Sequence, residues 1–345
     1  MTKSASEDPN GSDAGENTTT GQRMQIGWAP RGAACSHWAV ILAGGDGKRL
    51  LPLTRKLSGD DRPKQFCRLL GTQTLLEQTL RRVGRVVDPD HTFTVVTKSH
   101  EKFYSQLSGD FLVQPLNQGT TPAIVYSLVR VHELDPRAVV AFFPSDHYFG
   151  DDDAFSASVG QAFEFAESHT RDVVLLGVKP DRPETAYGWI EPDGPALESR
   201  SGTVFRVRRF WEKPSLSAAA DLVKRGCFWN SFVIAGRVES LLGLVRAAVP
   251  ALLWPFQKLA PKLFTKDEKT SVLKIYQEIR PSGFSQDVLS VCSRKLAVLC
   301  SKTLQWTDVG DVDRALALIR SKGLGLPPYL QRPGDEPAVI AAAAS

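Results

Sequence analysis

The chain has 345 residues, of which 42% are hydrophobic and 23% charged, and its formal net charge is +4. This composition is typical of a globular protein with enough material for one large domain or two smaller ones. So mild a positive charge does not favour a nucleic-acid partner, and no apolar run approaches the ~20 residues that cross a bilayer. We therefore expect a cytoplasmic protein that binds neither nucleic acid nor membrane.

Composition divides the chain into three parts. Residues 1–36 are polar and rich in Gly, Ser, Thr and Asn, so they offer little apolar surface to bury and predict a disordered leader. Residues 323–345 are rich in Pro and Ala and predict a loose C-terminal tail. The folded domain is expected at 37–322. The five cysteines of the chain, odd in number and without CxxC spacing, favour reduced thiols over disulfides or a zinc site.

The first half of the predicted domain alternates strands with helices. Short β-branched and aromatic runs predict buried strands at 38–43, 92–97, 138–144 and 172–178. Amphipathic stretches at 74–87 and 121–133 predict helices between them. Such alternation indicates an α/β fold whose mostly parallel sheet is covered on both faces. Ligands of these sheets gather at the carboxyl ends of the strands.

The pattern changes after residue 188. Two strands joined by turns are expected over 188–210, as part of a small antiparallel insertion that spans about 185–235. Later segments predict a proline-interrupted helical region at 239–274, strands at 295–300 and 302–310, and a helix near 313–321.

The first predicted strand runs directly into a glycine-rich turn, LAGGDGKRL. Glycine lets backbone N–H groups converge on an anion, so Gly44, Gly45 and Gly47 would let a triphosphate approach closely. Arg49 and Lys64 would add mobile charge against phosphate oxygens. The turn is neither a P-loop nor a dinucleotide-binding fingerprint. Taken alone, it is equally compatible with a glycine turn followed by a solvated basic loop.

The longer string LAGGDGKRLLPLT followed by RPKQF resembles the signature of sugar-1-phosphate nucleotidyltransferases, in particular mannose-1-phosphate guanylyltransferases. Further markers follow in family order: QPLNQGTTPAI at 114–124, FFPSDH at 142–147, YGWIE at 187–191, FWEKPS at 210–215, FWNSF at 228–232 and WTDVGD at 306–311. The resemblance covers about residues 37–322. It implies a Rossmann-like, GT-A-like core with a mixed, mostly parallel sheet.

Two aspartates in these markers carry the expected metal chemistry. Asp146 follows one strand-like run and Asp308 ends another. Taken singly, either aspartate would more often be a helix N-cap. By resemblance they match the two metal-binding aspartates of the family, and a pair of carboxylates suits Mg²⁺, which we expect as the cofactor. The catalytic residues expected from the resemblance are Arg49, Lys64, Asp146 and Asp308.

The resemblance also implies the residues that contact the two substrates. For the nucleotide these are Leu42, Ala43, Gly44, Gly45, Gly47, Thr120 and Pro122. For the sugar phosphate they are Gly188, Glu212, Lys213 and Asn230. By spacing alone, a surface salt bridge would explain Glu212 with Lys213, and a turn would explain Asn230. One departure from the family pattern is Gln118, which stands where an arginine is usual, close to the region expected to contact base and phosphates.

The implied activity is Mg²⁺-dependent transfer of a nucleotidyl group from GTP to mannose 1-phosphate, which gives GDP-mannose and pyrophosphate. Two alternatives stay open: the same chemistry on glucose 1-phosphate with UTP or dTTP, and a non-catalytic sensor of nucleotides or sugar phosphates. The expected partners are a nucleoside triphosphate and a sugar 1-phosphate, and a homodimer is left open.

Overall fold

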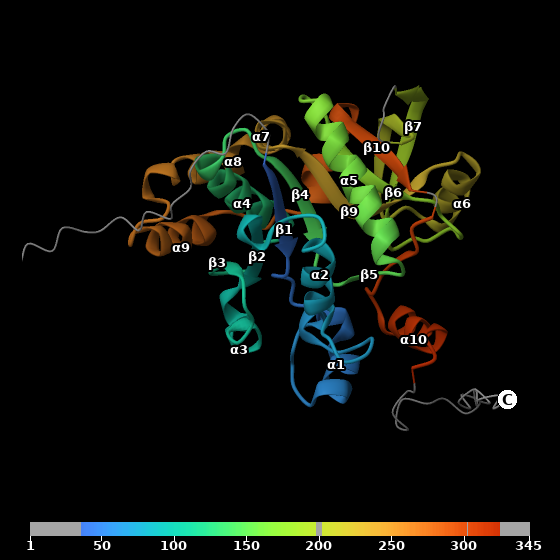
Figure 1. The fold of residues 1–345 in the computed structure, drawn as a ribbon, viewed down its shortest axis with the longest axis horizontal. Helices are drawn as coiled ribbons and strands as arrows, with labels where there is room; N and C mark the ends of the chain where they lie inside the picture. The colour runs from blue at the N-terminus through green and yellow to red at the C-terminus, as the bar shows by residue number, and fades with distance from the viewer. Residues whose placement is uncertain (1–35, 198–201, 302, 325–345) are drawn as a thin grey trace, which may run out of the picture. The chain divides into compact units, whose positions relative to one another are not determined.

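The computed structural model describes residues 36–197, 202–301 and 303–324 (Figure 1). These all belong to the compact unit formed by residues 35–345. The predicted leader, apart from Ser36, and the predicted tail from residue 325 onward lie outside the described residues.

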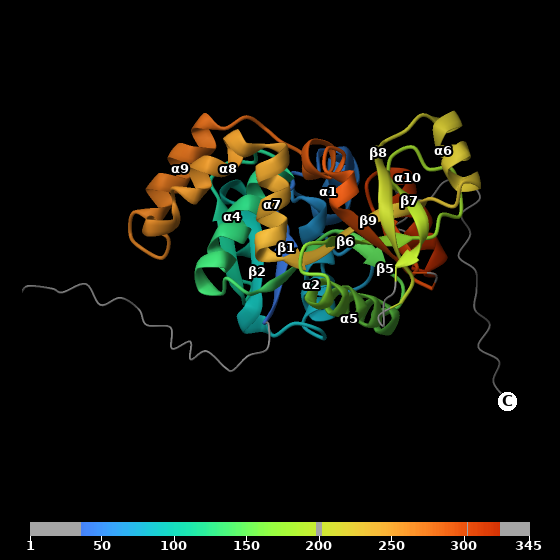
Figure 2. The same cartoon turned by 90° about the horizontal axis from the view of Figure 1, so that it is seen from above.

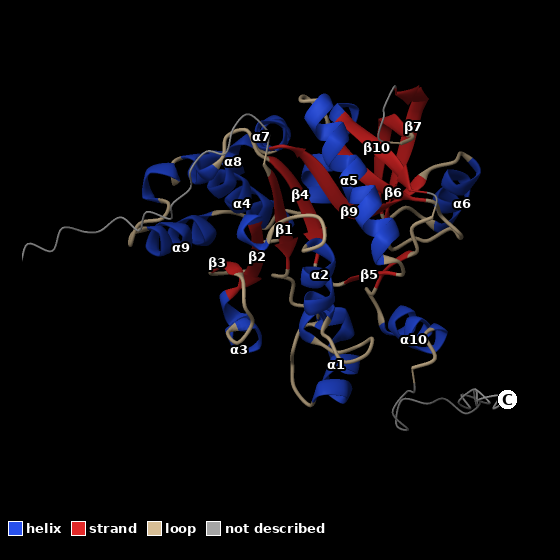
Figure 3. Ribbon diagram, in the orientation of Figure 1, coloured by secondary structure: helices blue, strands red, loops and turns tan. Residues whose placement is uncertain are grey.

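A nine-stranded mixed sheet in the described part of the chain organises the fold (Figure 3). Its order is β3-β2-β1-β4-β9-β6-β10-β8-β7. The strands are β1 (His37–Leu42), β2 (Thr92–Thr97), β3 (Asp110–Gln114), β4 (Val139–Pro144), β6 (Val173–Val178), β7 (Gly188–Leu197), β8 (Val204–Glu212), β9 (Phe228–Arg237) and β10 (Leu296–Ser301). Strands β3, β2, β1 and β4 run parallel to one another. A separate antiparallel pair joins β5 (His147–Phe149) to β11 (Trp306–Asp308).

Helices cover both faces of this sheet. They are α1 (Leu51–Ser58), α2 (Leu75–Val83), α3 (Glu101–Tyr104), α4 (Thr120–Leu134), α5 (Asp152–Ser168), α6 (Leu216–Lys224), α7 (Val238–Ala248), α8 (Pro250–Gln257), α9 (Glu268–Glu278) and α10 (Val312–Ser321). Figure 2 shows α4, α7 and α8 on one side of the sheet and α2 and α5 on the other. No helix in the described ranges is both long and apolar enough to span a membrane.

The two faces enclose separate hydrophobic cores, as the alternation of side chains along a strand requires. On β1, Trp38 and Val40 join the core beneath α4 and α7, whereas Ala39 and Ile41 join the core beneath α2 and α5. All four side chains are essentially inaccessible to solvent. A strand buried on both faces explains why this segment is apolar throughout rather than alternating.

The second half of the chain departs from the expected layout in one respect. The segment predicted as an insertion continues the main sheet, because β7 and β8 form an antiparallel hairpin at its edge. Strand β9 enters the sheet centre, antiparallel between β4 and β6. Because β9 also pairs with β7, it connects β4, which ends beside the glycine turn, to the hairpin.

Candidate active site

The glycine turn and Asp146 meet because β1 and β4 are parallel neighbours. Leu42, the last residue of β1, lies opposite Pro144, the last residue of β4. The Ser145 hydroxyl donates to the Leu42 carbonyl at 2.8 Å and ties the two strand ends together. Segments about a hundred residues apart in sequence thus leave the sheet side by side, at the edge where α/β proteins bind ligands.

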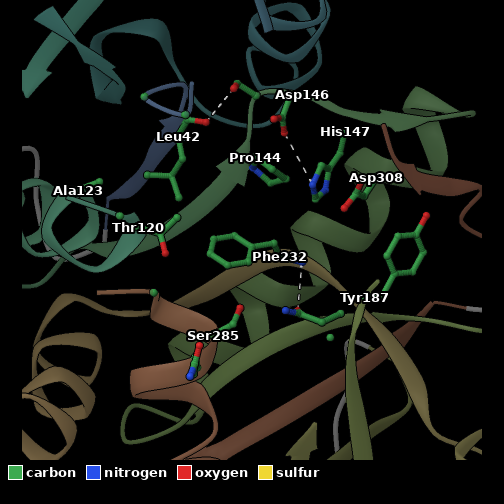
Figure 4. A pocket seen from close by; sticks show the side chains of 18 of the residues that line it. Leu42, Thr120, Ala123, Pro144, Asp146, His147, Tyr187, Phe232, Ser285 and Asp308 are labelled. Atoms are coloured by element: carbon green, nitrogen blue, oxygen red, sulfur yellow. Dashed lines mark hydrogen bonds and ion pairs between the residues drawn. The ribbon is translucent and has the colours of Figure 1, made fainter. Parts of the chain in front are cut away.

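A cavity of about 460 Å³ opens at this edge (Figure 4). The predicted site residues that line it are Leu42, Gly44, Gly45, Arg49, Lys64, Thr120, Asp146, Gly188, Glu212, Lys213, Asn230 and Asp308. Ala43 and Pro122 are buried outside the lining. Gly47 borders an adjoining cavity of about 420 Å³, which shares Arg49, Lys64 and Asp146 with the first. One site therefore unites residues from every motif noted in the sequence.

The backbone of the glycine turn is held from outside the turn. The buried Gln65 amide donates to the carbonyl oxygens of Ala43 and Gly45, both at 2.8 Å. The Thr97 hydroxyl donates to the Gly44 carbonyl at 2.8 Å. Because these carbonyls are fixed, the orientation of the neighbouring N–H groups is fixed as well. Gln65 was not expected among the site residues, although it stands in the RPKQF string.

The three glycines of the turn serve different needs. A Cβ at Gly44 would lie 2.5 Å from Gln114 Nε2, so packing inside the protein requires glycine there. Gly47 has a φ of +61°, which disfavours other residues. A Cβ at Gly45 would meet no atom within 4 Å, so the space beside it is open. Of the three, Gly45 is the one where an added side chain would meet no protein atom, although all three border a cavity.

Asp146 lies in a charged cluster with Lys64. Lys64 Nζ is 3.1 Å from Asp146 Oδ2 and donates to the Val309 carbonyl at 2.9 Å, and the lysine is 8% exposed. Burial raises the pKa of Asp146, but the nearby charges of Lys64 and His147 outweigh burial and hold that pKa below its usual value. Asp146 therefore stays a carboxylate.

His147 stands between the two aspartates. On the β5–β11 pair it lies directly opposite Asp308, and its Nε2 is 3.8 Å from Asp146 Oδ1. Its Nδ1 lies 3.2 Å from both the Trp306 indole nitrogen and the Ser231 carbonyl oxygen. Burial lowers the pKa of His147 even though both carboxylates act to raise it. His147 therefore interacts electrostatically with both aspartates.

Asp308 has one carboxylate oxygen that accepts no hydrogen bond. This oxygen, Oδ1, is buried, and the nearest cation is Arg314, whose Nη1 is 3.7 Å away. An unsatisfied buried carboxylate oxygen is costly unless a ligand completes it. No group of three or more His, Cys, Asp or Glu side chains within the described ranges forms a metal site. Two carboxylates nevertheless fit Mg²⁺, which completes its coordination with phosphate and water oxygens.

The opposite wall comes from the β7–β8 hairpin and β9. Lys213 Nζ pairs with Glu212 Oε1 at 3.2 Å, and the Lys213 side chain is 60% exposed. Its backbone N–H donates to the Tyr187 carbonyl at 3.2 Å. A Cβ at Gly188 would lie 2.8 Å from the Phe210 ring, so packing as well as ligand access favours glycine there. Asn230 is 7% exposed, and its Oδ1 accepts from the N–H of Phe232 at 3.1 Å.

Further lining residues were not expected from the sequence. They include Gln114, Tyr187, Phe232, Ser285, Gln286 and Trp306. Gln114 is the last residue of β3, a position that could have singled it out, and its Oε1 accepts from the Tyr276 hydroxyl at 3.0 Å. Gln118 does not line the cavity, and its amide donates to the Tyr276 carbonyl at 3.1 Å. The departure at residue 118 therefore removes no lining side chain.

Comparison with known proteins agrees with this geometry. A family model for nucleotidyl transferases matches residues 38–320. The chain is 29% identical over 286 residues to a mannose-1-phosphate guanylyltransferase from Escherichia coli strain K12, in a match that covers 79% of this chain and 58% of that protein. It is 35% identical over 213 residues to the alginate biosynthesis protein AlgA from Pseudomonas fluorescens, covering 59% and 42% of the two chains. The chain thus spans about half the length of the curated relatives it matches.

Solved structures share the fold. A crystal structure of a "mannose-1-phosphate geranyltransferase" from Thermus thermophilus superposes with a TM-score of 0.71 at 30% identity, covering 82% of this chain and 79% of that one. A mannose-6-phosphate isomerase from Helicobacter pylori superposes with a TM-score of 0.60 at 21% identity, covering 79% of this chain and all of that one. These similarities confirm the predicted α/β nucleotidyltransferase fold. The first also confirms the resemblance to sugar-1-phosphate nucleotidyltransferases that the sequence motifs indicate.

Proposed function

Because the chain belongs to the nucleotidyl transferase family, a family of enzymes, we propose that it transfers a nucleotidyl group from a nucleoside triphosphate to a sugar 1-phosphate. The observation that carries this proposal is the single cavity that unites the glycine turn, the two aspartates and the Glu212–Lys213 pair. The names of the relatives support GTP and mannose 1-phosphate as the substrates, with GDP-mannose and pyrophosphate as products.

The proposed reaction needs little proton transfer. A sugar-phosphate oxygen attacks the α-phosphorus in line, the bond from that phosphorus to the β-phosphate oxygen breaks, and pyrophosphate leaves. The attacking oxygen is already anionic, so no general base is required. The task of the protein is to align two mutually repelling anions. Arg49 beside the glycine turn and Lys213 on the opposite wall are the cations we assign to the nucleotide and the sugar phosphate, respectively.

Mg²⁺ is the cofactor we propose, with Asp146 and Asp308 as the residues that would hold it. The support is the Asp308 oxygen that accepts no hydrogen bond and the depressed pKa of Asp146, since Mg²⁺ prefers charged oxygen ligands. When bound, the ion would neutralise charge on the α-phosphate and on the departing pyrophosphate.

A substrate panel tests the proposal. Pyrophosphate release is measured with ATP, GTP, UTP and dTTP, each paired with mannose 1-phosphate and with glucose 1-phosphate, with and without Mg²⁺. We expect GTP with mannose 1-phosphate to exceed the ATP and UTP reactions by at least about tenfold in kcat/KM, because a pocket shaped for one base leaves polar groups unpaired with another. A clear preference for UTP or dTTP would transfer the assignment to glucose 1-phosphate chemistry. Nucleotide binding without turnover in the presence of Mg²⁺ would identify a sensor.

A further inference from the structure

Phe232 has a backbone conformation that a bulky residue rarely adopts. Its φ is +62°, in the left-handed region. Lys213 and Phe264 are the other described non-glycine residues with positive φ, at +47° and +62°. Such a conformation is strained for a side chain of this size and persists where surrounding contacts enforce it, often at functional sites. Lys213 and Phe232 line the cavity, whereas Phe264 does not.

A bulge in β9 holds Phe232 in place. In the pairing with β6, Leu175 lies opposite Ile234 and Gly177 lies opposite Asn230, so three residues of β9 face Leu176 alone. The Ser231 hydroxyl donates to the Leu176 carbonyl at 2.7 Å, and the Phe232 N–H donates to Asn230 Oδ1. Bulges beside active sites turn a side chain out of its regular direction. Here the bulge presents the Phe232 ring to the cavity.

The ring lies in the middle of the cavity. In Figure 4 it stands between Pro144 and Ser285, with Thr120 to one side. Its side chain is partly buried and packs against the core that includes Ala123. One part of the ring is thus supported by protein while another stays open to the cavity. Other apolar residues such as Leu42, Pro144 and Trp306 also line the cavity, but Phe232 is the apolar lining residue with a left-handed backbone.

The chemistry of the substrates indicates what such a ring contacts. Phosphates require cations, whereas two parts of the substrates offer a face for an aromatic ring: the flat ring of a base and the apolar C–H face of a pyranose. The neighbour of Phe232 is Asn230, a residue assigned to the sugar phosphate, and this favours the pyranose. Asn230 stands two residues before Phe232, and its Oδ1 accepts from the Phe232 backbone N–H, so the two residues form one hydrogen-bonded unit within the bulge. That unit belongs to β9, whose Trp229 pairs with Trp189 of the hairpin wall. A sugar bound here would therefore meet the Asn230 amide, which can hydrogen-bond its hydroxyls, and the Phe232 ring, which can contact its C–H face.

We propose that Phe232 determines which sugar 1-phosphate this enzyme accepts, by forming the apolar floor of the sugar site next to Asn230. The inference rests on the proposed function. Hexose 1-phosphates that differ in one axial or equatorial hydroxyl differ in which C–H groups they present to a flat ring. Because the bulge fixes where the ring is attached and the core supports one part of it, movement of the ring away from a wrongly placed hydroxyl would cost those contacts, and such epimers would be distinguished.

The test replaces Phe232 in the full chain and separates the two substrates kinetically. Phe232→Gly removes the ring and relieves the left-handed conformation at once. Phe264→Gly is the matched control, since it makes the same change at the same φ in an exposed residue outside the cavity. KM for the nucleotide and for mannose, glucose and galactose 1-phosphates is measured for wild type and both variants, with melting temperature as the check on folding.

We expect Phe232→Gly to raise KM for the preferred sugar phosphate about tenfold and to weaken the preference between hexoses at least about threefold. KM for the nucleotide should stay within about twofold, and Phe264→Gly should change neither value by more than that. If Phe232→Gly does not fold, Phe232→Leu, which keeps bulk but lacks a flat face, must show the same pattern.

Two results would overturn the inference alone: an unchanged KM for the sugar phosphate in a folded variant, or a rise in the nucleotide KM that equals or exceeds the rise for the sugar. A wild-type protein inactive on every sugar phosphate would overturn the proposed function and this inference with it. The two failures are distinguished by wild-type turnover.

Discussion

The ion pair between Lys64 and Asp146 offers a direct measure of how strongly the site is held together before substrate binds. Lys64 Nζ lies 3.1 Å from Asp146 Oδ2, and the two side chains are 10% and 23% exposed. A double-mutant cycle of Lys64→Met and Asp146→Asn isolates the pair, because each change removes the charge while keeping much of the side-chain volume.

The expected coupling follows from the distance and the burial. At 3.1 Å two unit charges attract by about 5 kcal/mol at an effective dielectric of about 20. Desolvation offsets much of this attraction, so we expect a coupling free energy of about 2 kcal/mol. Lys64→Met alone should lower the free energy of unfolding by about 3 kcal/mol, since it leaves Asp146 charged and poorly solvated.

The effect should depend on pH with a definite sign. In the wild type the folded pKa of Asp146 is lowered, so its contribution to stability is present above the unfolded value of about 3.9 and is lost as pH falls through the folded value. In Lys64→Met burial would be opposed mainly by His147, so the pKa of Asp146 should rise. The deficit of the variant should therefore be complete at pH 7 and shrink once the pH drops below that raised value.

Urea unfolding of the four proteins at pH 7 and at pH 4, without divalent cations, measures both effects. The matched control is the exposed pair of Lys98 with Glu101, whose charged atoms lie 2.7 Å apart at 59% and 54% exposure. The cycle on that pair should give a much smaller coupling, because solvent screens exposed charges. A Lys64–Asp146 coupling no larger than the control would refute the reasoning that burial strengthens this pair.

Three further outcomes are expected. Asp308→Asn should lower kcat about a hundredfold, equivalent to about 3 kcal/mol, with little change in melting temperature, and near-normal pyrophosphate release at limiting Mg²⁺ would contradict its metal role. Lys213→Ala should mainly raise KM for the sugar phosphate and Arg49→Ala should mainly lower kcat, whereas equal effects on both parameters would contradict that division. Burial raises the pKa of Cys67 and of Cys227 to about 11, so both thiols should stay protonated at pH 8. They should react with a disulfide reagent only as fast as the protein opens, and rapid reaction in the native protein would contradict their burial.

Local sequence patterns predicted elements better than they predicted pairing. The β-branched and aromatic run at 92–97 coincides with β2, whose six residues are all buried. The segment Phe228–Arg237 was assigned partly to an insertion, yet it is β9 at the centre of the sheet. Its composition indicates a strand, but its partners β4 and β6 lie far away in sequence. Nothing in the local pattern selects between a central and an edge position.

The same limit applies to the site. Motif residues at strand ends could be grouped in advance, because parallel strands bring their carboxyl ends to one edge. Gln65 could not be assigned its function, since that depends on two carbonyl groups that lie 22 and 20 positions earlier in the chain. Phe232 could not either, because its direction depends on a bulge that is defined only by the register between β9 and β6.

The two lysines of the site differ in how freely their side chains can move, and this difference affects the role that each can have. Lys64 already donates to the Val309 carbonyl and pairs with Asp146, so an incoming phosphate would find at most part of its donor capacity free. Lys213, with 60% of its side chain exposed, can follow a moving ligand at little energetic expense. In the proposed reaction, the fixed Lys64 would preserve the charge of the carboxylate assigned to Mg²⁺, whereas the mobile Lys213 would capture the sugar phosphate. Replacing Lys64 should therefore alter both stability and turnover, and replacing Lys213 should alter substrate affinity without altering stability.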